Sequence, residues 1–238
     1  MEDAFPPDFP VWVEKSEATT WPEKGIDATE TGDILLQWIL SDEDDIAKYL
    51  IFRGVLNDSS LEIDFEKIDI IDLNNPFESP DQYLDESAVV NQRYYYYLLA
   101  EDSGENLSDP SDTLDYMLLP SVYPSVMIPS SLNDIVSATP DLTWSYNYGT
   151  AMEDYVITLL DYDSKEFIVR DWFQPGNYVG SGEDWTFTPY WRVVNGDSTW
   201  MELLSMHRYQ WRIDQHADYE GNIEKTGSES AWAYFTVE

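Results

Sequence analysis

Short runs of alternating hydrophobic and polar residues, separated by proline, glycine and acidic turns, recur along the whole chain. In one run, Ile34, Leu36 and Trp38 fall on the same side of an extended strand, because successive side chains point to opposite faces. Such period-two patterns predict β-strands with one buried face. The only stretch with helical spacing is Ser198–Met206, which is equally compatible with an irregular crossover. We therefore expect an all-β protein.

One strand pattern occurs twice. Residues 93–102 read RYYYYLLAED and residues 208–214 read RYQWRID, so that each strand begins Arg-Tyr and then alternates aromatic with polar or aliphatic positions. Each is followed by a glycine turn, at Gly104 and Gly221, and by a final strand that contains serines. The repetition predicts two domains of the same kind in tandem.

A second repeat supports this division. Trp38 precedes Tyr49 by eleven residues, and Trp144 precedes Tyr155 by the same spacing. We expect each tryptophan to lie in the core next to the tyrosine of the following strand. Two prolines in residues 120–125 favour a stiff, extended linker. The predicted layout is an extended segment 1–10, a domain 11–119, the linker 120–125 and a second domain 126–238.

The first half resembles the fibronectin type III domain. The resemblance rests on Trp38, Tyr49–Arg53, Tyr83–Asp85, the alternating Tyr94, Tyr96, Leu98, Ala100 and Asp102 before Gly104, and Ser108–Ser111. The second half is similar to a looser immunoglobulin-like relative common in bacterial surface proteins, through Tyr209–Ile213, and departs from the pattern between residues 165 and 207.

The resemblance implies two tandem immunoglobulin-like antiparallel β-sandwiches. Tyr94 and Tyr209 would then be tyrosine corners, with the hydroxyl bonded to backbone upstream, and Tyr96 and Leu98 would point into the core. Such domains are typically extracellular spacers and binding modules, and seldom catalysts themselves.

The charge of the chain excludes several partners. It has 47 acidic and 12 basic residues, a net charge of −35. Nucleic acid and anionic membranes both require a positive patch, which these few cations cannot form. Solvation in a saline habitat, divalent cations or basic partners remain. There is no cysteine, so disulfides and cysteine-zinc sites are also excluded.

The N-terminal residues point to a compartment. No apolar run reaches the roughly 18 residues of a membrane span. The acidic, proline-rich residues 1–10 resemble the segment that follows the cleavage site of a bacterial lipoprotein, with Met1 in the place of a lipidated cysteine. An ordinary extended N-terminus is the alternative. We expect an extracytoplasmic protein at the cell surface or secreted, with a lipid anchor under the first interpretation.

Catalysis has little support in the sequence. With 47 carboxylates, close acidic pairs arise by chance, and none is nominated as a general acid/base couple. We expect no enzyme activity and no cofactor. Calcium is the one metal to consider, with Asp161 and Asp163 as ligands in an acidic turn. The turn lacks the glycine of a calcium loop, so a solvated hairpin turn is the alternative.

The divergent stretch of the second half is rich in aromatic residues. Six of them are candidates for partner or glycan binding: Trp172, Phe173, Tyr178, Trp185, Tyr190 and Trp191. Aromatic side chains on loops stack on sugars or anchor a protein partner. The alternative is that they pack as a satellite core. The predicted function is a structural or adhesive protein that binds protein or self-assembles, with free sheet edges that accept a partner strand. A carbohydrate-binding accessory module and a non-catalytic part of a larger secreted enzyme are the alternatives.

Overall fold

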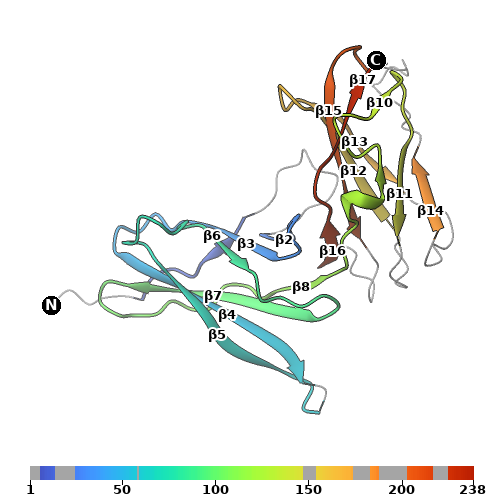
Figure 1. Cartoon of the computed structure of the whole chain (residues 1–238). Helices are drawn as coiled ribbons and strands as arrows, with labels where there is room; N and C mark the ends of the chain where they lie inside the picture. The colour runs from blue at the N-terminus through green and yellow to red at the C-terminus, as the bar shows by residue number, and fades with distance from the viewer. Residues whose placement is uncertain are drawn as a thin grey trace. The chain divides into compact units, whose positions relative to one another are not determined.

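The computed structural model describes residues 6–13, 25–57, 59–146, 154–173, 183–187, 203–216 and 225–238 (Figure 1). At positions 124, 145, 146, 154, 170–173, 183–187 and 216 it describes the backbone alone. The regular elements of these residues are strands, apart from one short 3-10 helix, Pro124–Val126. The predicted all-β fold is confirmed. The chain divides into two compact units, and the main division lies between Leu118 and Leu119.

The first unit contains two antiparallel sheets. Its strands are β1 (Val11–Trp12), β2 (Ile26–Ala28), β3 (Ile34–Ile39), β4 (Ile46–Asn57), β5 (Glu62–Asp72), β6 (Gln82–Asp85), β7 (Arg93–Asp102) and β8 (Leu114–Leu118). In one sheet β3 pairs with β1 and β2 along one edge and with β6 along the other. In the other sheet the order is β5-β4-β7-β8.

The two sheets of the first unit pack face to face around one core, which makes it a β-sandwich (Figure 1). Ile34, Leu36 and Trp38 come from one sheet, and Tyr49 and Ile51 from the other. All five are at most 1% exposed, so the predicted inner faces are confirmed. The rings of Trp38 and Tyr49 lie 5.5 Å apart with an interplanar angle of 61°. This edge-on arrangement is one that aromatic pairs prefer.

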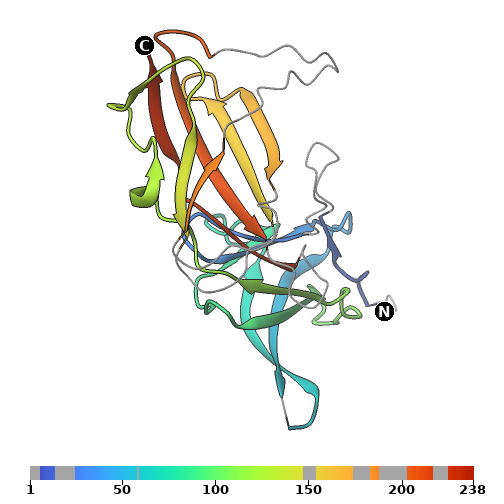
Figure 2. The same ribbon diagram turned by 90° about the vertical axis from the view of Figure 1, so that its right-hand side faces the viewer.

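The second unit has a comparable strand order (Figure 2). Its strands are β9 (Met127–Ile128), β10 (Ile135–Val136), β11 (Leu142–Tyr146), β12 (Asp154–Asp161), β13 (Phe167–Phe173), β14 (Glu183–Phe187), β15 (Arg208–His216), β16 (Thr226–Glu229) and β17 (Ala233–Val237). One sheet has the order β9-β11-β14. In the other, β12 lies between β13 and β15, and β16 and β17 pair with successive parts of β15. The short β10 runs parallel to β17.

The core of the second unit repeats the tryptophan–tyrosine contact. Trp144 and Tyr155 lie 5.2 Å apart at 67°, close to the geometry of the first unit, and both side chains are fully buried. Trp211 from β15 packs against Trp144 at 6.5 Å. The equal spacing of these pairs in the sequence therefore corresponds to an equal contact in the structure.

A serine hydroxyl bonds to the neighbouring strand where the last strand of each unit is interrupted. The hydroxyl of Ser111 accepts a hydrogen bond from the amide of Leu98 at 3.0 Å, and that of Ser230 accepts one from Ile213 at 2.9 Å. Leu98 and Ile213 each follow the strand tyrosine by four residues. The side-chain oxygen satisfies a buried amide where the strand backbone bends away. Of the stretch predicted as a possible helix, the structure describes Leu203–Met206, which is not helical.

Candidate interaction surface

Tyr94 and Tyr209 make matching contacts. The Tyr94 hydroxyl accepts a hydrogen bond from the amide of Val89 at 3.2 Å, and the Tyr209 hydroxyl accepts one from the amide of Leu204 at 2.9 Å. Each donor lies five residues upstream of its tyrosine. Both rings are buried. The bond anchors the segment that enters each strand, so these tyrosines serve the scaffold.

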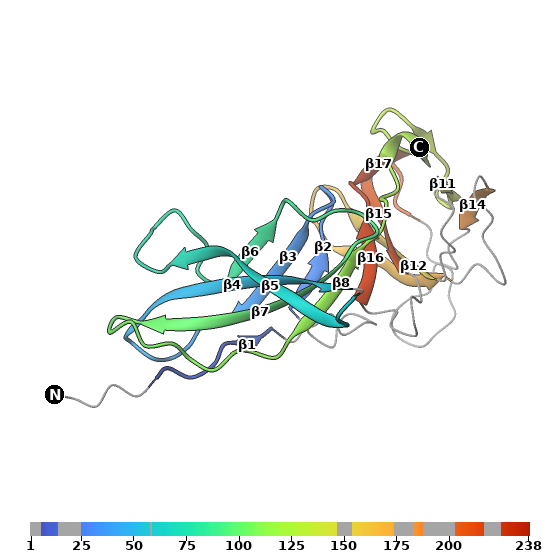
Figure 3. The same cartoon turned by 90° about the horizontal axis from the view of Figure 1, so that it is seen from below.

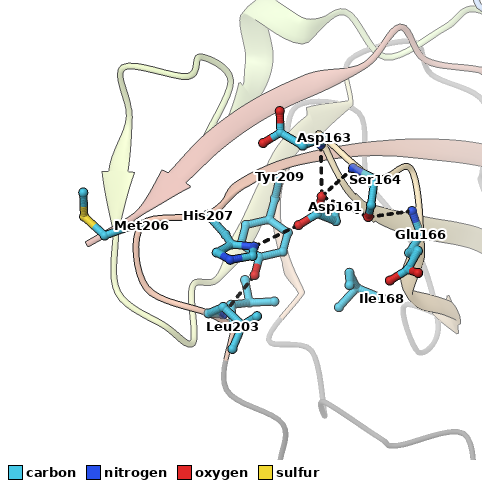
Figure 4. A pocket seen from close by; sticks show the side chains of 10 residues that line it. Asp161, Asp163, Ser164, Glu166, Ile168, Leu203, Met206, His207 and Tyr209 are labelled. Carbon is cyan, nitrogen blue, oxygen red and sulfur yellow. Dashed lines mark hydrogen bonds and ion pairs between the residues drawn. The ribbon is translucent and has the colours of Figure 1, made fainter.

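Asp161 is used by the turn that follows β12 (Figure 4). One carboxylate oxygen accepts bonds from the amides of Asp163 and Ser164, at 3.0 and 2.8 Å, and from the Ser164 hydroxyl at 3.1 Å. The other oxygen lies 3.1 Å from Nδ1 of His207. The backbone bond from Ser164, followed by the His207 contact, lowers the pKa of Asp161 to about 2. The Asp163 carboxylate in turn pairs with Arg208.

These contacts leave the predicted calcium ligands engaged with protein donors. In the part of the chain that the structure describes, no group of three or more His, Cys, Asp or Glu side chains has the arrangement of a metal site. Calcium binding at Asp161 and Asp163 stays a prediction.

A pocket of about 560 Å³ lies beside this turn (Figure 4). Its lining combines Asp161 and Glu166 with the apolar side chains of Ile168, Leu203 and Met206. The Met206 side chain is 82% exposed, whereas Leu203 is buried. Of the acidic residues that line it, Asp161 is already bound by the turn and Asp163 pairs with Arg208.

The side chains of the aromatic candidates lie outside those that the structure describes. Tyr178, Tyr190 and Trp191 lie outside the described residues. For Trp172, Phe173 and Trp185 the structure describes only the backbone, in β13 and β14. Partner or glycan binding by these side chains stays a prediction.

An aromatic and aliphatic surface that the sequence pattern did not predict covers the outer face of the first unit's β5-β4-β7 sheet. We call it the outer patch. Its members come from three neighbouring strands: Phe52, Leu56, Ile63, Phe65, Ile70, Tyr95, Tyr97 and Leu99. The Phe52 and Tyr97 rings stack at 4.6 Å and 6°, and Phe65 meets Tyr97 edge-on at 4.8 Å. Large aromatic side chains of this kind dominate the energetics of protein interfaces.

Several members of the outer patch remain accessible. Leu56 is 42% exposed, Ile70 38% and Phe65 37%. Gly54 lies beneath it: a Cβ there would come within 2.4 Å of Ile63 Cγ2 and 2.7 Å of Phe65 Cδ1. The glycine therefore lets these side chains fold over the strand. The result is a closely packed surface that is open to solvent, on a sheet that can be followed in Figure 3.

A buried ion pair holds the sheet that carries the outer patch. The Arg53 guanidinium donates to both oxygens of Asp85, at 3.1 and 2.9 Å, and Asp85 is fully buried. The hydroxyls of Tyr96 and Ser87 also donate to Asp85, at 2.8 and 2.7 Å. Burial alone would raise the pKa of Asp85, but the bonds from Ser87, Tyr96 and Arg53 outweigh it and lower the pKa. Arg53 thereby ties β4 to β6 across the sandwich.

The outer face of the second unit is different. Arg208 and Lys165 lie over the Tyr162 ring, at 4.8 and 4.3 Å from its centroid. Arg212 lies 4.9 Å over the Trp232 ring and pairs with Glu229. Here cations cover the aromatic rings and carboxylates balance the cations. Five outward-facing residues of β12 and β15 are nevertheless at most 8% exposed, namely Val156, Thr158, Leu160, Gln210 and Asp214. Exposed charge pairs therefore lie beside a buried part of this face.

Comparison with known proteins assigns no family. No protein-family model matches the sequence. No curated protein is significantly similar to it. Within the described residues there is no helix long and apolar enough to cross a membrane.

Similar solved structures are distant. The FN1-FN3 domains of chicken CNTN1 align with 97% of the chain and 69% of that protein, at 13% identity and a TM-score of 0.36. A β-1,2-glucanase from Parabacteroides distasonis aligns over 50% of the chain, at 24% identity and 0.34. The pectate lyase PelI from Erwinia chrysanthemi aligns over 38%, at 17% and 0.29. The aligned parts are 14% of the glucanase and 25% of the lyase. At these scores the similarities carry no argument about function.

Proposed function

We propose that the chain is a non-enzymatic protein of two tandem fibronectin type III-like β-sandwiches that acts outside the cytoplasm, at the cell surface or secreted, by binding another protein. The observation that carries the proposal is the outer patch. A closely packed aromatic surface that stays open to solvent is costly for an isolated protein and is typical of an interface. The strand order of the two units and the contacts of Tyr94 and Tyr209 support the assignment to the fibronectin type III and immunoglobulin-like class.

The hydrogen bonds of the buried carboxylates support a scaffold role. Asp85 is bound by an arginine and two hydroxyls, and Asp161 by turn amides and His207. Asp102 accepts bonds from the amides of Gly104 and Asn106, each at 2.8 Å. Each of these groups is committed to a turn or to a strand contact, which supports a structural rather than a catalytic role for them.

The test removes the outer patch and leaves the scaffold. A Phe65→Thr/Tyr97→Thr variant keeps strand-forming residues at both positions. The matched control, Tyr162→Thr/Tyr234→Thr, removes two aromatic side chains that contact one another in the second unit. Each protein is crosslinked to the surface and secreted fractions of the cells that produce it, and captured proteins are quantified by mass spectrometry.

We expect a protein that the parent and the control capture to be lost from the Phe65→Thr/Tyr97→Thr variant. Equal capture by all three would contradict the proposal. Binding of the parent to a glycan array that is lost in Trp172→Ala/Trp185→Ala would instead favour the carbohydrate-binding alternative.

A further inference from the structure

The outermost strand of the outer patch, β5, has a free edge. β5 is eleven residues long, and among the described residues it pairs only with β4. β4 and β5 form a hairpin. Beyond Gly54, β4 no longer pairs with β7, so β4 and β5 continue alone and the hairpin projects from its unit (Figure 2). An uncovered edge strand presents backbone donors and acceptors to solvent and can pair with another chain.

The free edge lies in the first half of β5. The Leu73 amide donates to the Ala47 carbonyl, so Ala47 directs its backbone groups at β5. This direction alternates along a strand, so the other odd-numbered residues of β4 also face β5. Arg53 is one of them, and its partner Glu66 therefore directs its backbone groups back at β4. Three residues of β5 therefore present their backbone groups outward: Ile63, Phe65 and Lys67.

Farther along β5, carboxylates block the edge. The Ile70 amide donates to Asp69 at 2.7 Å, and the Asp72 amide donates to Glu78 at 2.9 Å. These bonds occupy the amides that an added strand would need. An incoming strand would therefore pair with the first half of β5 alone.

The two faces of β5 differ in chemistry. Ile63 and Phe65 belong to the outer patch, whereas Glu62, Asp64 and Glu66 alternate with them and so point to the opposite face. The Glu66 side chain is 72% exposed and lies 3.6 Å from Arg53. Lys67, opposite Phe52, lies on the same face as Ile63 and Phe65. A strand added to β5 would therefore place one row of side chains beside Ile63, Phe65 and Lys67 and the other beside carboxylates.

Charge determines which strand this edge accepts. β5 carries five carboxylates, Glu62, Asp64, Glu66, Asp69 and Asp72, against the single cation Lys67. Carboxylates on an edge repel a second copy of the same acidic chain and attract a cationic one. Since the whole chain has a net charge of −35, this preference is reinforced at longer range.

We propose that the first half of β5 is a strand-addition site for a basic partner, whose extended segment alternates Lys or Arg with apolar residues. The apolar side chains of that segment extend the outer patch, and its cations meet Glu62, Asp64 and Glu66. The inference rests on the proposed protein-binding function and specifies the chemistry of the partner.

The probe is a fluorescent peptide as long as β5, KVKVKVKVKVK, titrated with the full chain and followed by anisotropy. One control peptide, KKKKKKVVVVV, has the same composition without the alternation, and another, EVEVEVEVEVE, reverses the charge. We expect the alternating peptide to bind at least about tenfold more tightly than either control. Its binding should weaken as salt screens the charges.

Two variants locate the site. Lys67→Pro removes an outward amide, a substitution that edge strands tolerate, and Lys67→Ala is its control. Asp64→Lys/Glu66→Lys reverses the charge of the edge, and Asp42→Lys/Asp44→Lys makes the same charge change in an exposed turn. We expect Lys67→Pro and Asp64→Lys/Glu66→Lys each to weaken binding about tenfold or more, and their controls to bind like the parent.

Several results would overturn the inference: equal binding of the alternating and block peptides, binding by both edge variants like the parent, or no saturable binding up to about 1 mM. Dimerisation of the parent that Lys67→Pro abolishes would assign the edge to a second copy instead. A native partner that is lost with the outer patch and unaffected by Lys67→Pro would leave the proposed function standing and remove only this inference.

Discussion

The two units share an interior and differ on the outside. In both, a buried tryptophan meets the tyrosine of the next strand, a strand tyrosine accepts a bond from the amide five residues upstream, and a serine hydroxyl bridges the broken last strand. On the outer faces, the first unit presents stacked Phe52 and Tyr97, whereas the second covers Tyr162 with Arg208 and Lys165. The fold constrains the inner faces, so binding is free to differ on the outer ones.

The units also differ at one core position. Four residues after the tyrosine that contacts the core tryptophan, Tyr49 or Tyr155, the first unit has Arg53 and the second has Leu159, which is buried. The first unit therefore encloses a charge that requires Asp85, and the second encloses a hydrocarbon at the equivalent place.

The largest effect should follow removal of Asp85. Asp85→Ala removes the buried partner of the Arg53 guanidinium and leaves it only the exposed Glu66 carboxylate at 3.6 Å, which should cost about 3 kcal/mol of unfolding free energy. Hydrogen exchange measured by mass spectrometry separates the units: protection should fall in Tyr94–Ala100 and persist in Tyr209–Ile213.

A double replacement provides the control. Arg53→Leu/Asp85→Leu removes both charges and imitates the second unit, so it should be less destabilised than Asp85→Ala. Equal loss of protection in both units would contradict this account of the ion pair. So would a lower unfolding free energy for Arg53→Leu/Asp85→Leu than for Asp85→Ala.

The strand tyrosines should have smaller and matching effects. Tyr94→Phe and Tyr209→Phe each remove one hydroxyl and leave a backbone amide without its partner. Each should cost about 1–2 kcal/mol, measured by urea unfolding with exchange of the same two strands as the readout. If only one of the two substitutions destabilises its unit, the equivalence of the units does not hold.

Acid should destabilise both units through the same kind of group. The pKa values of Asp85 and Asp161 are both lowered, that of Asp161 to about 2. A lowered pKa gives stability that is complete above the ordinary pKa of about 4 and is lost as pH falls toward the folded value. The thermal midpoint should therefore fall between about pH 4 and pH 2. In Asp161→Asn the acid-induced fall of the thermal midpoint should be smaller for the second unit. A pH profile unchanged from the parent would exclude Asp161 as a source of this pH dependence.

The smallest effect is expected on the outer face of the second unit. Arg208 is 45% exposed at its side chain and pairs with Asp163. Arg208→Ala should change the unfolding free energy by no more than about 1 kcal/mol, because solvent screens exposed ion pairs. A loss of several kcal/mol in denaturant unfolding would show that the Arg208–Asp163 pair is structural and not screened by solvent.

The sequence was sufficient for the inner faces and insufficient for the outer patch. Ile34, Leu36 and Trp38 alternate with less buried neighbours, so their periodicity identified the core. The run Tyr49–Phe52 is apolar at every position, because Tyr49 and Ile51 point inward and Leu50 and Phe52 outward. Periodicity cannot separate two apolar faces.

Long-range pairings could not be predicted from the sequence either. Arg53 and Asp85 are 32 residues apart and meet only because β4 and β6 lie in opposing sheets. In the same way, Asp161 belongs to an acidic cluster that suggests a cation site. Its oxygens instead accept bonds from the turn and from His207, which lies 46 residues away. Composition gives the net charge of a segment, whereas the fold determines which donors its carboxylates bond.

The central claim is that the first unit binds its partner through β5 and the outer patch. Hydrogen exchange of the full chain, with and without the peptide KVKVKVKVKVK, compares β5 with β13, the corresponding edge of the second unit. The account predicts new protection at Ile63–Lys67 and none at Phe167–Phe173. Protection at β13, or binding without protection of β5, would contradict it.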